Sequence, residues 1–175
     1  MKENQIDDSE KEIFDALLND SYSDDLETIF SQYRLLVETT NEIGTRRENM
    51  NKFYLSLITI IYGIITFISV NCHILFSIVP LLFVIVVSFS WKNHINQYKL
   101  LNEAKFNIIN YLENYLPVYA FTKEWELLDN YGYTGLSKWD KMIANSLIIF
   151  SVALIATILL SEQAIICNYI NMIFN

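Results

Sequence analysis

The sequence is dominated by one long uncharged stretch, residues 53–91. It contains no Asp, Glu, Lys or Arg over thirty-nine residues, and Lys52 and Lys92 bound it. A single helix of that length would measure about 58 Å, roughly twice the thickness of the hydrocarbon core of a bilayer. The stretch must therefore fold back on itself. The polar segment 70–73 is the expected turn, which predicts a transmembrane hairpin over residues 53–91 with spans 53–70 and 74–91.

A third apolar segment, residues 142–161, is uncharged and long enough for one more crossing. The apolar runs are continuous rather than alternating, which is typical of helices and not of β-barrels. Because the chain has only 175 residues, of which 53% are hydrophobic, it has no room for a large separate enzyme domain. The sequence therefore predicts an all-α membrane protein with three transmembrane helices and cytoplasmic amphipathic helices.

The basic residues lie in two segments that flank the spans. All twelve Lys and Arg fall within residues 1–52 or 92–141, although the formal net charge is −8. By the positive-inside rule, both segments face the cytoplasm. The acidic start of the sequence does not resemble a cleavable signal peptide. We therefore expect a cytoplasmic N-terminus, three crossings and a C-terminus outside.

The segments outside the spans divide by composition and periodicity. Residues 1–25 form an acidic arm whose apolar positions 13, 14, 17 and 18 fit either a docking helix or a solvated tail. Residues 26–52 have the spacing of an amphipathic helix, with Gly44 as a possible kink. Residues 92–141 predict a helix that ends near Pro117, a short helix capped by Thr122, and a capping box at Ser137. The tail, residues 162–175, either extends the third helix or lies along the outer interface.

Several short motifs resemble the RipA family of bacterial inner-membrane proteins. They are Tyr33-Arg34-Leu35-Leu36-Val37-Glu38, Arg46-Arg47, Asn51-Lys52-Phe53-Tyr54-Leu55, Trp91, residues 97–106, Leu112-Glu113, Leu116-Pro117 and Glu124-Trp125. The resemblance covers roughly residues 30–160 and carries no chemical signature.

The resemblance implies a homo-oligomer, from tetramer to octamer, in the bacterial inner (cytoplasmic) membrane. Similar small multi-span proteins accompany nucleotide-synthesising enzymes in antiphage systems such as Hailong, where the membrane component resembles a regulated channel. This implies that the partners include other copies of the chain, the lipid bilayer, and a cytoplasmic protein or nucleotide-type ligand.

The sequence contains no catalytic signature. No CxxC, HExxH, GxSxG, P-loop or GxGxxG pattern occurs. The two histidines, His73 and His94, fall on opposite predicted sides of the membrane, so they cannot share a metal within one subunit. We therefore expect a non-enzymatic protein with no cofactor and no metal.

Two cysteines, Cys72 and Cys167, are both predicted near the outer face, where an oxidising compartment permits a disulfide. Two unpaired thiols are the favoured interpretation, because connectivity does not follow from sequence.

Small and hydroxylated residues recur every three or four positions in the first span. Close helix packing uses such a stripe, and so does a narrow water-filled pore. Packing is the commoner use, and both interpretations stay open. No span carries a charge at mid-depth, which argues against a proton pump or a voltage sensor. The candidate pore or packing stripe is Ser56, Thr59, Gly63 and Thr66.

Seven basic residues flank the spans on the predicted cytoplasmic side. Topology alone explains them as contacts to anionic lipid. In a ring of subunits they would surround one axis, where the arginine pair could hold a phosphate bidentately. Interleaved acids lower the local potential, so lipid contact is favoured over ligand binding. These candidate anionic-ligand or lipid contacts are Arg46, Arg47, Lys52, Lys92, Lys99, Lys138 and Lys141.

The function expected from these features is that of a gated channel or membrane effector controlled through its cytoplasmic helices, with antiphage defence as one setting. The alternative is a nonconducting scaffold or adaptor for envelope proteins. Conduction through a reconstituted bilayer separates the two.

Overall fold

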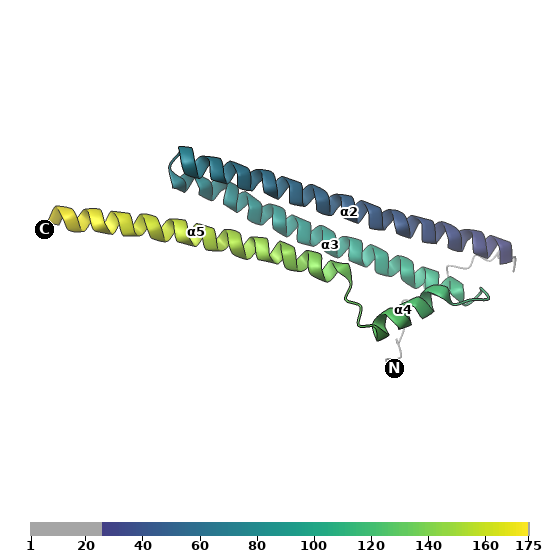
Figure 1. The fold of residues 1–175 in the computed structure, drawn as a ribbon. Coiled ribbons are helices and arrows are strands. Elements are labelled where there is room, and N and C mark those ends of the chain that lie inside the picture. Colours follow the sequence, from purple (N-terminus) through teal and green to yellow (C-terminus); the bar gives the residue numbers. More distant parts are fainter. Residues whose placement is uncertain (1–25, 175) are drawn as a thin grey trace. The chain divides into compact units, whose positions relative to one another are not determined.

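The structure is a computed structural model that describes residues 26–174, with side chains described for residues 26–164. Its elements are α2 (Leu26–Asn71), the short 3-10 helix η1 (Ile74–Ser77), α3 (Ile78–Glu113), α4 (Ala120–Asn130) and α5 (Leu136–Phe174) (Figure 1). Three helices, α2, α3 and α5, are long and apolar enough to cross a membrane. The predicted fold class, an all-α protein with three transmembrane helices, is confirmed. The acidic arm, residues 1–25, lies outside the described residues.

The long uncharged stretch folds back within the predicted turn. α2 continues through Gly44 to Asn71, and the amide of Cys72 donates to the carbonyl of Ile68 at 2.8 Å. His73 then caps η1, because its Nδ1 accepts a hydrogen bond from the amide of Leu75 at 3.4 Å. The reversal therefore begins in the predicted polar turn and is completed by η1, so α3 starts at Ile78 rather than at residue 74.

The chain divides into two compact units. Unit 1 comprises Met1–Ile43 and Leu100–Tyr133, and unit 2 comprises Gly44–Lys99 and Thr134–Asn175. Unit 2 contains all three predicted spans, whereas unit 1 contains the first part of α2, the end of α3, and α4.

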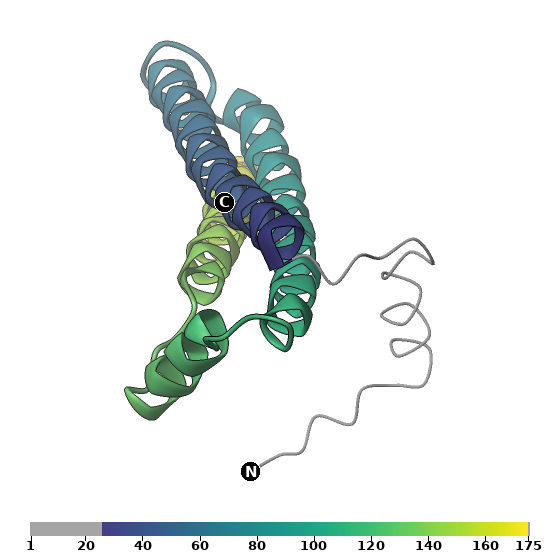
Figure 2. The same cartoon turned by 90° about the vertical axis from the view of Figure 1, so that its right-hand side faces the viewer.

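Unit 2 is a three-helix bundle in which α3 returns antiparallel beside α2, and α5 packs on this hairpin (Figures 1 and 2). On α2 and α3 its core residues repeat every three or four positions, as expected for helices packed along their length. Because Ala144 is fully buried, α5 presents a small side chain where it meets the hairpin. The buried cluster is Tyr54, Ile58, Ile61, Ile65, Leu81, Val84, Val87, Trp91, Ile95, Ala144 and Ile158.

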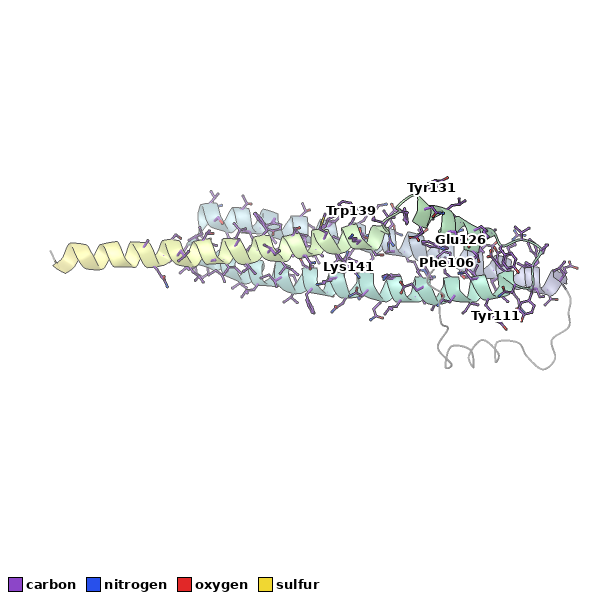
Figure 3. The ribbon with its side chains drawn as sticks, turned by 90° about the horizontal axis from the view of Figure 1, so that it is seen from below. Phe106, Tyr111, Glu126, Tyr131, Trp139 and Lys141 are labelled. Atoms are coloured by element: carbon purple, nitrogen blue, oxygen red, sulfur yellow. The ribbon has the colours of Figure 1, made fainter. Side chains whose placement is uncertain are left out.

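Unit 1 is held by aromatic contacts between α3 and α4. The ring of Phe106 on α3 lies 5.5 Å from Trp125 and 6.0 Å from Phe121, centroid to centroid. Figure 3 shows Phe106 against α4. Tyr33 on α2 joins the cluster through Phe121, at 6.2 Å.

The ends of the later helices differ from their sequence prediction. α3 ends at Glu113, ahead of Pro117, and the chain continues in hydrogen-bonded turns. The predicted capping box at Ser137 is wrong in register, because α5 begins at Leu136 and Ser137 lies inside its first turn. α5 runs to Phe174, so residues 162–174 extend the third helix.

Candidate functional site

A polar cluster joins the three helices of unit 2 where α5 begins. Nδ2 of Asn51 on α2 donates to Oδ2 of Asp140 on α5 at 3.0 Å, and Nε1 of Trp91 on α3 donates to Oδ1 of Asn51 at 2.8 Å. Since an indole nitrogen can only donate, Trp91 fixes the orientation of the Asn51 amide. One side chain thus connects α3 to α5. We call Arg47, Asn51, Trp91, Ser137 and Asp140 the clasp.

Arg47 adds a charged contact to the clasp. Its Nη2 lies 3.9 Å from Oδ2 of Asp140, and its Nη1 donates to Oγ of Ser137 at 3.3 Å. The side chains of Arg47 and Asp140 are 24% and 19% exposed, so the pair is neither solvated nor fully desolvated. At this length the ion pair is weak, and it links the first turn of α5 to α2.

The hairpin side of the clasp is held by ring stacking, hydrogen bonds and burial. The ring of Tyr54 stacks on Trp91 with centroids 6.0 Å apart and an angle of 14°. The hydroxyl of Tyr54 lies 2.6 Å from Nδ1 of His94 and 3.1 Å from Oγ of Ser90, both on α3. Tyr54 and Trp91 are buried. The α2 and α3 contributions to the clasp are therefore fixed by packing and hydrogen bonds on the hairpin itself.

Unit 1 contains a second polar site, built on the buried carboxylate of Glu113. Its Oε1 accepts from the Phe121 amide at 2.7 Å and from the Tyr33 hydroxyl at 3.1 Å. Its Oε2 accepts from the amide of Thr122 at 3.1 Å and from its hydroxyl at 2.7 Å. The prediction that Thr122 caps α4 is therefore wrong, because Glu113 accepts from the orphan amides at the start of that helix and Thr122 is one of its donors. Glu113 thereby ties α2, α3 and α4 together.

Burial and hydrogen bonding shift the pKa of Glu113 in opposite directions. This residue lies well beyond the uncharged spans. Desolvation raises the pKa of its carboxyl, but the bonds from Phe121, Thr122 and Tyr33 outweigh it and leave the pKa below its ordinary value. The neighbouring Tyr33 shows the reverse effect, because burial and the carboxylate of Glu113 raise its pKa to about 12. Glu113 is therefore an anion at neutral pH, held by hydrogen-bond donors.

The predicted basic contacts all belong to unit 2, but they differ in surroundings. Arg47 is turned into the clasp rather than into solvent. Lys52 is exposed and pairs with Glu48 on the same helix at 2.7 Å. Arg46, Lys99 and Lys138 are exposed, and Lys92 and Lys141 are half-buried. Figure 3 shows Lys141 and Trp139 at the start of α5. Ligand binding by these residues stays a prediction.

The hydroxyl stripe lies on the outer surface of unit 2. Ser56, Thr59, Gly63 and Thr66 are all exposed, and a Cβ placed on Gly63 would meet nothing within 4 Å. The hydroxyls of Thr59 and Thr66 donate to the carbonyls of Leu55 and Tyr62 on their own helix. The stripe therefore takes no part in the core of the single chain, and it is available to lipid, water or another subunit.

Sequence reasoning missed three residues whose polar contacts connect different helices, Trp91, Glu113 and Asp140. The sequence gives Asp140 only a place three residues after Ser137 in the predicted capping box, and Trp91 only a place at the end of a span and in a family-like motif. Glu113 sat in a family-like motif without a role. Their partners lie on other helices, so no local spacing pattern identifies them.

At the hairpin turn, a contact joins the turn to α5. Nε2 of His73 lies 3.8 Å from Oε1 of Glu162. Cys72 is exposed at the hairpin turn, and Cys167 lies outside the described side chains, so their pairing is untested. Among the described residues, no three His, Cys, Asp or Glu side chains are grouped in a way that could hold a metal ion.

Three spanning helices joined by a polar clasp at one end define a multi-pass helical membrane protein. Residues 30–160 match the Octameric membrane protein family (8xMP), and because the match covers most of the chain, the protein belongs to this family of oligomeric membrane proteins. No curated protein and no solved structure matches the chain. The narrower resemblance to RipA stays a prediction.

Proposed function

We propose that the chain assembles into a homo-oligomeric channel of the bacterial inner membrane, with no catalytic activity, whose pore is lined by the hydroxyl stripe of α2. The observation that carries the proposal is the exposure of Ser56, Thr59, Gly63 and Thr66 on the surface of a spanning helix. Eight copies is the number that the family name supports.

The exposed surface of α2 has a hydroxylated flank and an apolar flank, which suit different surroundings. At about 100° of rotation per residue, Ile60, Ile64 and Phe67 lie beside the stripe on the same exposed side of the helix. They are large, apolar and exposed, as lipid contacts or subunit interfaces require. The hydroxyl flank is the one suited to water, because a hydroxyl can exchange its bond to the helix carbonyl for one to solvent.

The spans also have surface to share with other copies. Between 17% and 33% of each apolar window is buried within the single chain, so most of every span faces outward. Association in a bilayer depends on close packing rather than on a hydrophobic driving force, and a stripe with a glycine permits it. The same argument supports the second candidate, a nonconducting scaffold whose stripes only pack against each other.

Control of the pore would come from the cytoplasmic part. Unit 1 is continuous with two spanning helices, so a partner or nucleotide-type ligand bound there could act on the membrane part. A membrane effector in antiphage defence is one use of such an arrangement.

Cysteine accessibility in planar bilayers tests the pore assignment. In a background with Cys72→Ser and Cys167→Ser, we expect a charged methanethiosulfonate reagent to block current through Thr59→Cys. The matched control is Ile60→Cys, one position along on the apolar flank, which should be insensitive. Equal block at both positions contradicts the assignment. A sealed bilayer from an oligomer of confirmed mass, under every ligand tried, favours the scaffold.

A further inference from the structure

We propose that the clasp is a releasable coupling, which holds the start of α5 against the hairpin and passes changes in unit 1 to the third span. The inference concerns a conformational device that is independent of whether the oligomer conducts.

The clasp lies where the two units are joined along the chain. The chain passes between the units at Ile43–Gly44, Lys99–Leu100 and Tyr133–Thr134. Arg47 follows the first of these by about one helical turn, and Ser137 lies in the first turn of α5, shortly after the third. Trp91 precedes the second by about two turns. Each covalent connection therefore enters unit 2 on a segment that carries clasp residues.

The start of α5 has few other contacts to hold it. None of residues 136–143 is buried, and the large side chains of Leu136 and Trp139 are 57% and 54% exposed. The first buried residue of α5 is Ala144, which offers only a methyl group to the packing. Upstream, the loop from Tyr131 to Gly135 contains Gly132 at φ 70°, a conformation that glycine adopts without strain. The polar contacts of the clasp are therefore the main interactions that hold this segment against the hairpin.

The contacts within the hairpin (α2 and α3) are stronger than the contacts between the hairpin and α5. This difference determines that α5 is the helix that moves. Trp91 and Tyr54 are buried and stacked, so the hairpin keeps its arrangement without α5. The α5 side depends on Asn51 Nδ2 at 3.0 Å from Asp140 and on the longer contacts of Arg47. Segments with few buried apolar contacts open first. Release therefore frees the start of α5 and leaves α2 and α3 in place.

Hydrogen exchange on the full-length protein in nanodiscs tests the first part of the proposal. We expect Asp140→Ala to speed exchange of the amides of residues 136–143 by about tenfold or more, since the charge-assisted hydrogen bond from Asn51 and the ion pair with Arg47 are both lost. Exchange in residues 54–65 of α2 should stay unchanged. The matched control is Asp129→Ala, an exposed acid on α4, which should alter neither segment. Acceleration in both segments, or in neither, overturns the proposal.

A second variant tests the coupling. Glu113→Gln loosens the start of α4 in unit 1, and we expect it to speed exchange in residues 136–143 when the clasp is intact. In an Asp140→Ala background it should add nothing there. Equal effects in both backgrounds mean that the change does not pass through the clasp. Hydrogen exchange and conductance are independent measurements. A sealed bilayer would refute the channel, and the exchange data would still test the coupling.

Discussion

Replacing Glu113 by Gln changes one atom of a buried side chain and removes its charge. Four donors point at this carboxylate, from Tyr33, from the amide of Phe121, and from the amide and hydroxyl of Thr122. Hydrogen bonds to a charged group contribute about 1.5–3 kcal/mol, against about 0.5–1.5 kcal/mol for neutral pairs. The new amide nitrogen would also face two donors without accepting from them. We expect a loss of about 3 kcal/mol in the local stability of unit 1.

Hydrogen exchange of α4 in the full-length protein measures this loss directly. A change of about 3 kcal/mol corresponds to roughly a hundredfold faster exchange where opening is local. The matched control is Glu126→Gln on the same helix, whose exposed carboxylate pairs with Lys123 at 2.8 Å. Exposed pairs of this kind contribute little, so exchange should hardly change. Equal exchange in Glu113→Gln and the wild type would refute the assignment of Glu113 as the cap of α4.

The same site predicts a pH dependence with a definite sign. The pKa of Glu113 is lower in the folded protein than its ordinary value of 4.5. Its contribution is therefore complete above that value and is lost as the pH falls through the lower, folded pKa. Wild-type α4 should lose protection only in this acid window, and Glu113→Gln should show no such step. A step of equal size in both proteins would assign it to another group.

Three further outcomes can be measured. Ala144→Leu should destabilise the bundle by about 1–3 kcal/mol because Ala144 is fully buried, whereas Ala153→Leu on the exposed side of α5 should not, as thermal unfolding in detergent would report. With Cys167→Ser, the exposed thiol of Cys72 should react with a membrane-impermeant maleimide in intact cells, and labelling only after permeabilisation would reverse the predicted topology. In the wild type, free thiols at both cysteines on nonreducing electrophoresis and mass mapping would exclude a disulfide.

The spans were predictable because absence of charge and length are local properties. Residues 53–91 are too long for one crossing, so the chain has to reverse within them. The polar segment 70–73 indicates the place of the reversal. The cap of α4 was not predictable in the same way. Thr122 was chosen because hydroxyl side chains usually cap the helix they precede, but the carboxylate that satisfies these amides comes from the end of α3. A capping residue from another helix leaves no spacing signal.

The clasp depends on helix rotation, which sequence patterns do not specify. One residue along α5 corresponds to a turn of about 100°, so a rotation of that size would present Trp139 or Lys141 to Asn51 in place of Asp140. The periodicity of span three is too weak to choose between them. The same limit explains why Arg47 was grouped with the other basic residues, although its neighbour Arg46 is exposed and Arg47 contacts Asp140.

The polar contacts between helices of unit 2 are neutral within the spans and partly charged at the clasp. This difference affects which contacts can separate when unit 2 changes conformation. Within the spans, the cross-helix contacts pair hydroxyls, as in Tyr62 with Ser151 at 3.1 Å and Ser69 with Ser77 at 3.0 Å. Such neutral contacts tie helices together in a bilayer, where an unpaired polar group has no water to replace its partner. The clasp combines a charge pair with side chains that are still partly exposed. Water can therefore compensate its groups when they separate, which lowers the cost of detaching this end of α5.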